Sequence, residues 1–497
     1  MSAKRSTRQR FQPVEIGQVG GVRGIVEAVA ETMTSFGGAP MIAAAERKVG
    51  LIAELCGRIN DPRKQHLVDH QAEDVVLQQV CQTGLGHADG NDADWLKGDA
   101  AMLCALNRDP ICGQAGSSQE TNSRFAARAI NKGNEQAVKG LFIDHFIAQH
   151  RKRKPAWGKY WRRRSKRKCI TIDVDGSMIK TYGAQEGAIH RGGKYKHEMY
   201  YPSFAFIGGW LVAASLRMGC EAESKTIIVQ LEMIVPRLRK EWAGVRIRVR
   251  LDAAFGSPEL YRWCRKNHVD YEVGLKSTSV LELYARWFKH AAQEEFEKEF
   301  GEAKFLGKDG TEKAQAEHER IRKIEDPDER MLAEKEHRAR RSRIVGEFSY
   351  RSEKWDNWER VIVRVDYTDR GFDVRYVMVS WQDGWPQHIY EDEYCQRGTM
   401  EQFIGQFKQT GRKLSAQSFY SNQFRIIIYG VAYMLLLHLR ESVGGRLASS
   451  DVDSMRKTLM IMPMIIRRSK TKMVLQISEN HVHCSEFLRA WRRLTAA

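Results

Sequence analysis

The sequence lacks the usual marks of a secreted or membrane-spanning protein. Its nine cysteines include no C-x-x-C pair, which argues against a disulfide framework or a zinc ribbon and indicates reduced thiols. The longest apolar run, from Ile426 to Leu437, is about a dozen residues, too short to cross a bilayer. No apolar segment of a signal peptide follows the basic N-terminus. We therefore expect a cytoplasmic protein with no membrane partner.

Acidic residues are too few to balance the basic ones. The 497 residues include 80 Lys and Arg against 62 Asp and Glu, which gives a net charge of +18. The excess predicts association with a polyanion such as nucleic acid. It is densest at residues 151–168, where eleven of eighteen residues are Lys or Arg and aromatic residues lie between them. Such a segment favours phosphate contacts with stacking, although a solvated linker is the alternative. The candidate contact residues are Trp161, Arg162, Arg163, Arg164 and Lys166.

The periodicity changes along the chain. Residues 21–150 are predicted to be helical. From residue 169 short strands alternate with helices, and two of these strands end at acidic residues, Asp175 and Asp252. Residues 281–343 are predicted to form charged helices, residues 344–380 strands, and the rest of the chain helices, apart from a short strand near His481–Cys484. An α/β protein of two to four domains is expected.

One helix carries an unusual combination of side chains. Tyr394, Arg397, Glu401 and Lys408 would lie within an arc of roughly 60° on an α-helix. A carboxylate with two cations and a phenol suits a divalent metal bound to a phosphate, because the acid holds the metal and the cations hold the phosphate oxygens. The alternative is a solvated helix face with an ion pair between Arg397 and Glu401.

Three acids from separate elements complete the candidate site. Asp175, Asp252 and Glu401 would converge on one sheet edge, as in RNase H-like nucleotidyl transferases, where two Mg²⁺ ions need several oxygen ligands. Asp173 shares a strand face with Asp175, so geometry alone leaves the first ligand open. Asp252 could instead cap the following helix.

The Tyr-Arg-Glu-Lys spacing resembles the signature of DDE insertion-sequence transposases. The segments around Asp175 and Asp252 resemble the first and second aspartate blocks of the same group. Taken in order, these blocks are similar to the bacterial insertion-sequence family numbered thirteen-eighty. The resemblance implies that Asp175, Asp252 and Glu401 hold two Mg²⁺ ions, for which Mn²⁺ can substitute. It also implies that Tyr394, Arg397 and Lys408 contact phosphates near the cleaved end.

The same resemblance implies an α/β fold with an RNase H-like core interrupted by a mixed α/β insertion, between helical N- and C-terminal regions. It implies cut-and-paste transposition on double-stranded DNA, with inverted repeats at the transposon ends, a target DNA, and a homodimer or higher multimer in a nucleoid-associated complex. It also implies that an insertion tryptophan can hold a flipped base, with Trp355, Trp358, Trp381 and Trp385 as candidates, while core packing is the alternative role for most of them. We divide the chain into an N-terminal DNA-binding region (1–150), a basic linker (151–168), the first part of the core (169–280), the insertion (281–390), the second part of the core (391–440) and a C-terminal region (441–497).

Two other functions remain open at this point. The chain could be a catalytically inactive, transposase-derived DNA-binding protein or repressor. It could also be an RNase H-like nuclease, although hydrolysis alone does not require a tyrosine, an arginine and a lysine to hold a DNA end.

Overall fold

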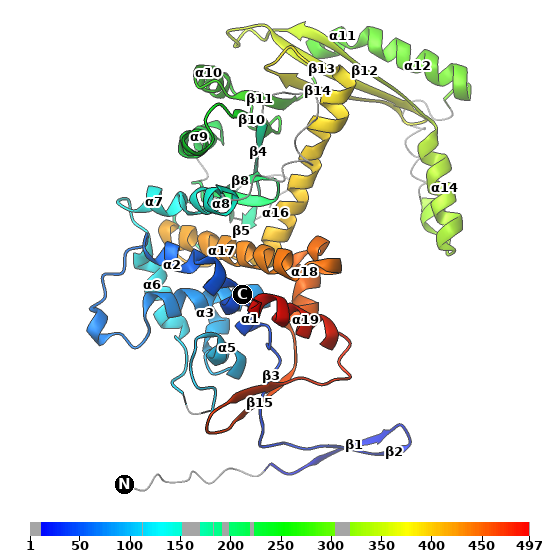
Figure 1. Cartoon of the computed structure of the whole chain (residues 1–497). Helices are drawn as coiled ribbons and strands as arrows, with labels where there is room; N and C mark the ends of the chain where they lie inside the picture. Colours follow the sequence, from blue (N-terminus) through cyan, green and yellow to red (C-terminus); the bar gives the residue numbers. More distant parts are fainter. Residues whose placement is uncertain are drawn as a thin grey trace. The chain divides into compact units, whose positions relative to one another are not determined.

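The computed structural model describes residues 11–111, 113–151, 169–181, 183–190, 198–218, 223–303 and 319–496. They form a mixed α/β protein with two compact units. The first unit comprises Met1–Val49, Val68–Gln119 and Leu435–Ala497, and the second comprises Gly50–Leu67 and Glu120–Met434. Figure 1 shows the elements coloured along the chain. The six segments delimited from the sequence stay a prediction.

The first unit is mainly helical. Its helix α1 packs on α3, α5 and α19, and β15 pairs with both β16 and β3 in a small antiparallel sheet. Its elements are β1 (Val14–Val19), β2 (Val22–Val26), β3 (Thr32–Thr34), α1 (Ala39–Val49), α3 (Ala72–Leu85), η2 (Gly90–Asp92), α4 (Ala93–Leu96), α5 (Ala100–Ala105), η6 (Gly445–Ser449), α18 (Val452–Met455), η7 (Arg456–Met460), β15 (Met464–Arg468), β16 (Met473–Gln476) and α19 (Cys484–Thr495).

The helical prediction is wrong at both ends of the chain. Residues 22–26 and 32–34 are strands, because β-branched residues flank Gly20 and Gly21, whose positive φ angles form a hairpin turn. Near the C-terminus, β15 and β16 form a second hairpin. The strand expected near His481–Cys484 is absent from that described segment, where a turn leads into α19.

A mixed eight-stranded sheet dominates the second unit, with the order β12-β13-β14-β11-β10-β4-β8-β9. Its strands are β4 (Cys169–Gly176), β8 (Ser203–Ile207), β9 (Trp210–Ser215), β10 (Arg246–Leu251), β11 (Asp270–Leu275), β12 (Arg341–Tyr350), β13 (Glu359–Thr368) and β14 (Gly371–Val379). The neighbours β4, β10 and β11 run parallel, and the other pairs are antiparallel. The strands of the predicted insertion therefore extend this sheet beyond β11.

Helices cover both faces of the sheet. In Figure 1, α9 and α10 lie on one side of the central strands and α16 lies on the other. The remaining elements of this unit are α2 (Leu51–Cys56), η1 (Gln65–Leu67), α6 (Gln119–Ala129), α7 (Glu135–Lys139), α8 (Leu141–Arg151), β5 (Ile179–Lys180), β6 (Ile189–His190), β7 (Glu198–Tyr200), α9 (Glu223–Glu241), α10 (Pro258–Lys266), α11 (Ser279–Tyr284), α12 (Arg286–Phe300), α14 (Pro327–Ala339), α15 (Pro386–His388), η4 (Ile389–Glu393), η5 (Tyr394–Arg397) and α16 (Gly398–Thr410).

Helix α17 (Phe419–Val443) contains the apolar run noted in the sequence. Among the described residues it alone is long and apolar enough to cross a membrane. The apolar window of this helix is 83% buried inside the protein, as is typical of a core helix.

Candidate active site

Two neighbouring strands bring the candidate aspartates to one edge of the sheet. Asp175 lies at the end of β4, and Asp252 follows the last residue of β10. The two strands are parallel, with Leu251 opposite Val174, so both aspartates emerge at the same edge. Asp252 is not the cap of the next helix: Ser257 caps α10 by accepting a hydrogen bond from the Leu260 amide.

The segment that carries Glu401 is not one regular α-helix. It passes from α15 through a π-helix (η4) and a 3-10 turn (η5, Tyr394–Arg397) into α16, which begins at Gly398. The arc predicted for an uninterrupted α-helix therefore does not apply, because a 3-10 turn advances about 120° per residue. Such interruptions often occur at functional sites.

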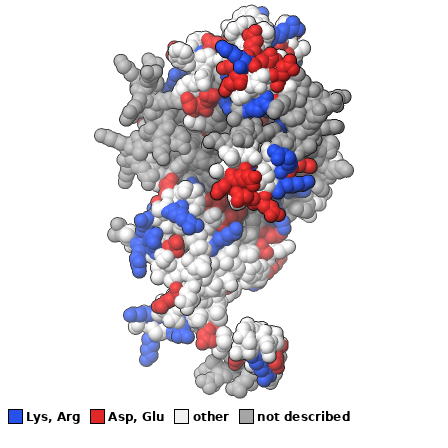
Figure 2. Space-filling view, turned by 90° about the vertical axis from the view of Figure 1, so that its right-hand side faces the viewer, with Lys and Arg blue, Asp and Glu red and all other residues white. Residues whose placement is uncertain are grey.

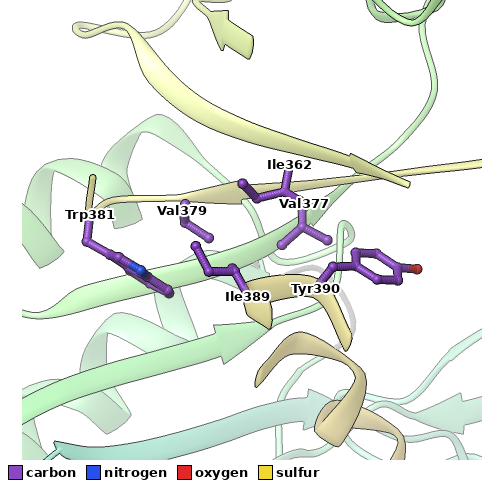
Figure 3. Packing of buried hydrophobic residues seen from close by; sticks show 6 residues of the cluster. All are labelled: Ile362, Val377, Val379, Trp381, Ile389 and Tyr390. Atoms are coloured by element: carbon purple, nitrogen blue, oxygen red, sulfur yellow. The ribbon is translucent and has the colours of Figure 1, made fainter. Parts of the chain in front are cut away.

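Apolar packing on the sheet fixes the start of this segment. Ile389 and Tyr390 of η4 lie against Ile362, Val377, Val379 and Trp381 from β13, β14 and the residues after them, as Figure 3 shows. Burying each large side chain contributes about 1.5–3 kcal/mol. The strands of the predicted insertion thereby position the helix that carries Glu401.

Three carboxylates surround the guanidinium of Arg397. Its Nη2 lies 2.8 Å from Asp175 Oδ2 and 3.6 Å from Asp252 Oδ2, and its Nη1 lies 3.8 Å from Glu401 Oε1. The side chain of Asp175 is 14% exposed, that of Asp252 47% and that of Glu401 72%. We call Asp175, Asp252, Arg397 and Glu401 the open cluster. It brings together four residues that were predicted from the sequence.

Asp175 is the most buried acid of the open cluster. Its pKa is raised to about 6, mainly by burial and also by the nearby carboxylates of Asp252 and Glu401, while Arg397 and the Gly176 amide oppose the rise. The pKa is elevated even though Arg397 is an ion-pair partner, so desolvation outweighs the single cation. A carboxylate in this state gains strongly from additional positive charge.

Asp173 belongs to a different cluster, which is buried beneath the segment η4–η5. It accepts two hydrogen bonds from Arg250, one of them 2.9 Å long, and both side chains are 6% exposed. Arg250 also donates to the Glu393 carbonyl, and Arg248 donates to the Glu393 carboxylate at 2.6 Å. Glu272 lies opposite Arg250 on β11. We call Asp173, Arg248, Arg250, Glu272 and Glu393 the closed cluster.

Glu272 is the unusual member of the closed cluster. It is fully buried, and neither of its side-chain oxygens has a hydrogen-bond partner among the described residues. Burial raises its pKa to about 8, despite the nearby Arg248 and Arg250. With Glu272 neutral, the two arginines balance Asp173 and Glu393.

Tyr394 and Lys408 lie beside the open cluster. The Tyr394 hydroxyl occupies the space next to Gly274, where any side chain on β11 would collide with it. Burial raises the pKa of Tyr394 to about 12. Burial also lowers the pKa of Lys408, assisted by Arg412 and opposed by the attraction of Asp175. Both side chains are partly withdrawn from water, which strengthens any charge interaction they make.

The other predicted residues lie elsewhere. Trp161, Arg162, Arg163, Arg164 and Lys166 are outside the described residues. The part of the surface shown in Figure 2 carries Lys and Arg beside Asp and Glu rather than one continuous basic area. Glu186, which lies in the sequence between Asp175 and Asp252, accepts a hydrogen bond from the first amide of α17.

The structure separates the four tryptophans considered from the sequence. The ring of Trp381 is buried, 3.9 Å from the Arg248 guanidinium, and Trp355 packs edge-on against Tyr261 and Tyr350. Trp358 and Trp385 are 61% and 82% exposed.

The closed cluster was missed by the sequence analysis. Its signal was the alternation of Arg246, Arg248 and Arg250 along β10, which predicted the strand but not what its polar face contacts. Arginines in the middle of a buried sheet require buried acids, and such a pairing could have been sought among the acids of β4 and β11.

The donor set suits a divalent cation such as Mg²⁺, since three carboxylates from β4, the end of β10 and α16 supply hard oxygen ligands. In the described part of the chain, no group of three or more His, Cys, Asp or Glu residues is already arranged to hold an ion. Instead, the three carboxylates converge on Arg397.

Comparisons with known proteins place the chain in a family. A search of curated proteins finds no match. Among solved structures, a piggyBac transposase in a synaptic complex with hairpin DNA is similar, with 9% identity and a TM-score of 0.38 over 92% of this chain and 82% of that one. The family model described as transposase DDE domain group 1 matches residues 25–497. Because this match covers nearly the whole sequence, the chain belongs to the DDE transposase family, group 1.

Proposed function

We propose that this chain is an active, Mg²⁺-dependent transposase that cuts a mobile element out of double-stranded DNA and joins it to a target. The observation that carries the proposal is the open cluster: Asp175, Asp252 and Glu401 all lie within 4 Å of one guanidinium. Three separate elements supply these acids at one end of a mixed sheet. This arrangement supports an RNase H-like core within the wider transposase fold.

Asp175, rather than Asp173, is proposed as the first metal ligand. Asp173 is held by two hydrogen bonds from Arg250 in a buried site, whereas Asp175 lies with Asp252 and Glu401. Moving Asp173 to a metal would leave Arg250 buried without its carboxylate, at a cost of several kcal/mol. Asp175, Asp252 and Glu401 would hold two Mg²⁺ ions, or Mn²⁺ in their place. The bound ions would polarise the phosphodiester and make an attacking water or 3′-hydroxyl more acidic.

The chain's own residues bind and orient the DNA end. Arg397 and Lys408 supply cations next to the acids, and Tyr394 supplies a hydroxyl from a fixed position above Gly274. The basic residues 161–166 would add phosphate contacts and stacking. If one tryptophan holds a flipped base, Trp385 is favoured over Trp381 and Trp355, because it is 82% exposed and only nine positions before Tyr394.

The proposal extends to the setting of the reaction. Membership of the insertion-sequence family numbered thirteen-eighty, with terminal inverted repeats as the binding sites, rests on the motifs around Asp175, Asp252 and Glu401. Two element ends must be held together, which favours a homodimer or higher multimer. The nine cysteines without a paired motif favour a cytoplasmic protein, and the net charge of +18 favours its association with the nucleoid.

The direct test is strand cleavage of labelled duplexes that carry the inverted repeats flanking the gene, with Mg²⁺ or with EDTA. Wild type should nick at the repeat boundary only with the metal, and Asp252→Ala should not nick. Glu299→Gln, which changes an exposed acid on α12, is the matched control and should cleave normally.

Two outcomes would favour other functions. Tight binding to the repeats without cleavage under any divalent metal would indicate a silent DNA-binding protein or repressor. Cleavage without joining to a target plasmid, and without preference for the repeats, would indicate an RNase H-like nuclease.

A further inference from the structure

The guanidinium of Arg397 lies where positive charge is needed among the three acids. It donates to Asp175 Oδ2 at 2.8 Å, whereas Asp175 Oδ1 accepts a hydrogen bond from the Gly176 amide, and it is within 4 Å of Asp252 and Glu401. A Mg²⁺ ion binds carboxylate oxygen at about 2.0–2.1 Å. An ion bound to Asp175 Oδ2 would therefore lie less than about 5 Å from Nη2. Two cations that close repel each other and compete for the same carboxylates.

A second observation indicates that Arg397 is incompletely satisfied where it lies. Its Nε is buried and has no hydrogen-bond partner among the described residues. Its contacts with Asp252 and Glu401, at 3.6 and 3.8 Å, are ion pairs longer than hydrogen bonds. Arg250 in the closed cluster provides the contrast, since it makes three hydrogen bonds to Asp173 and Glu393. Arg397 holds its acids loosely and retains a donor without an acceptor.

We propose that Arg397 is a displaceable counter-cation: it neutralises the three acids while metal is absent, and it leaves them when metal and a DNA phosphate arrive together. The phosphate offers the guanidinium two acceptors in its preferred forked geometry, including one for Nε. Metal removes the need for Arg397 at the acids, and phosphate gives Arg397 a new partner. Divalent metal and DNA end therefore bind cooperatively.

This inference rests on the proposed function for the identity of the anion, but its first test needs no DNA. Mn²⁺ binding to the full chain is measured by calorimetry or by the electron paramagnetic resonance signal of unbound Mn²⁺. Arg397→Gln removes the competing charge and should bind Mn²⁺ roughly 5- to 100-fold more tightly than wild type. Arg397→Lys keeps the charge and should stay close to wild type. Arg412→Gln is the matched control and should not change Mn²⁺ affinity, because Arg412 is a neighbouring cation whose Nε donates to the Lys408 carbonyl.

The opposite prediction follows if Arg397 only contacts phosphate or only supports the fold. In that case Arg397→Gln would bind Mn²⁺ alone with wild-type or weaker affinity, and the inference would be overturned. Melting temperatures separate a loss of stability from a change in metal affinity. In EDTA, Arg397→Gln should melt at a lower temperature than wild type, and Mn²⁺ should raise its melting temperature by more. An equal gain in the two proteins would also contradict the inference.

The second step adds a duplex with the element end. DNA should tighten Mn²⁺ binding to wild type several-fold and should have a much smaller effect on Arg397→Gln, whose acids are already without a competitor. Equal tightening in both proteins would count against the exchange. Failure of the proposed function looks different, because the duplex would then fail to bind or to be cut while the Mn²⁺ difference between Arg397→Gln and wild type persisted.

Discussion

The open and closed clusters use the same residue types in opposite ways. Both place an arginine among acids, and two of those acids, Asp173 and Asp175, are only two residues apart on β4. Asp173 and Arg250 are 6% exposed and joined by two hydrogen bonds, whereas Arg397 meets acids that are up to 72% exposed through one hydrogen bond and two longer ion pairs.

This difference separates a structural role from a chemical one. A buried, doubly bonded pair cannot exchange its partner without leaving a charge stranded in the core. A loosely held, partly solvated set of acids can exchange one cation for another at little cost. The closed cluster therefore anchors the segment η4–η5 through Glu393, and the open cluster at the end of that segment remains available for ligands.

The largest expected effect of a single substitution is on catalysis through the open cluster. Glu401→Gln keeps the shape of the side chain but removes a negative ligand, so cleavage should fall by at least about 1,000-fold, or about 4 kcal/mol. Binding of the element end, measured by fluorescence anisotropy in EDTA, should remain within about a factor of three. Cleavage within tenfold of wild type would remove Glu401 from the proposed site.

The free energy of unfolding should depend more on the closed cluster than on the open one. Arg250→Met leaves Asp173 buried without its partner and should lower the free energy of unfolding by about 3–5 kcal/mol. Arg397→Gln breaks one hydrogen-bonded pair, with Asp175, and two longer pairs with more exposed acids, and should cost less, about 1–2 kcal/mol. Urea denaturation of the two variants in EDTA makes the comparison. Equal losses would mean that the two clusters do not differ as proposed.

The tryptophans allow a similar comparison at a smaller scale. Trp381→Ala removes a buried ring that supports η4 and Arg248, and should cost about 3 kcal/mol of unfolding free energy. Trp385→Ala alters a side chain that is 82% exposed and should change stability by less than about 0.5 kcal/mol. Thermal melting distinguishes them, and a large loss for Trp385→Ala would reveal packing that the structure does not show.

The most gradual effect, at most about 1.4 kcal/mol per pH unit, is a change in the slope of stability with pH. Glu272 keeps its proton up to about pH 8 in the folded chain, against an ordinary value of 4.5. Between these values only the folded state holds the proton, so its contribution to stability is full at low pH and is lost as pH rises towards 8. Glu272→Gln should remove on the order of 3 kcal/mol of this decline between pH 5.5 and 8. Parallel stability curves for Glu272→Gln and wild type would show that Glu272 is already ionised.

Much of the second unit could be predicted from the sequence, because its signals are local. The alternation in β4 and β10 predicted both strands, and the expected convergence of Asp175 and Asp252 on one sheet edge agrees with the parallel pairing of these strands. The spacing around Glu401 predicted that Arg397 would accompany it. The strands that end near Asp175 and Asp252, and the helix that carries Glu401, could be assigned from the local sequence without knowledge of distant contacts.

What could not be predicted depends on pairing across the sheet. Asp173 and Asp175 are equivalent by periodicity, and only the position of Arg250 opposite Asp173 distinguishes their surroundings. The interruption of the helix at η4 and η5 accompanies the packing of Ile389 and Tyr390 on β13 and β14, a tertiary contact that helical periodicity does not contain. The N-terminal hairpin was missed because its β-branched residues were read within a longer helical stretch.

The most direct measurement compares Asp175→Asn with Asp173→Asn in metal-dependent cleavage of the element end, with each rate normalised to the folded fraction. We predict that Asp175→Asn remains folded and loses cleavage by at least about 1,000-fold, while the folded fraction of Asp173→Asn still cleaves. Cleavage by Asp175→Asn at a wild-type rate, together with a folded but inactive Asp173→Asn, would contradict the assignment of the open cluster as the catalytic site.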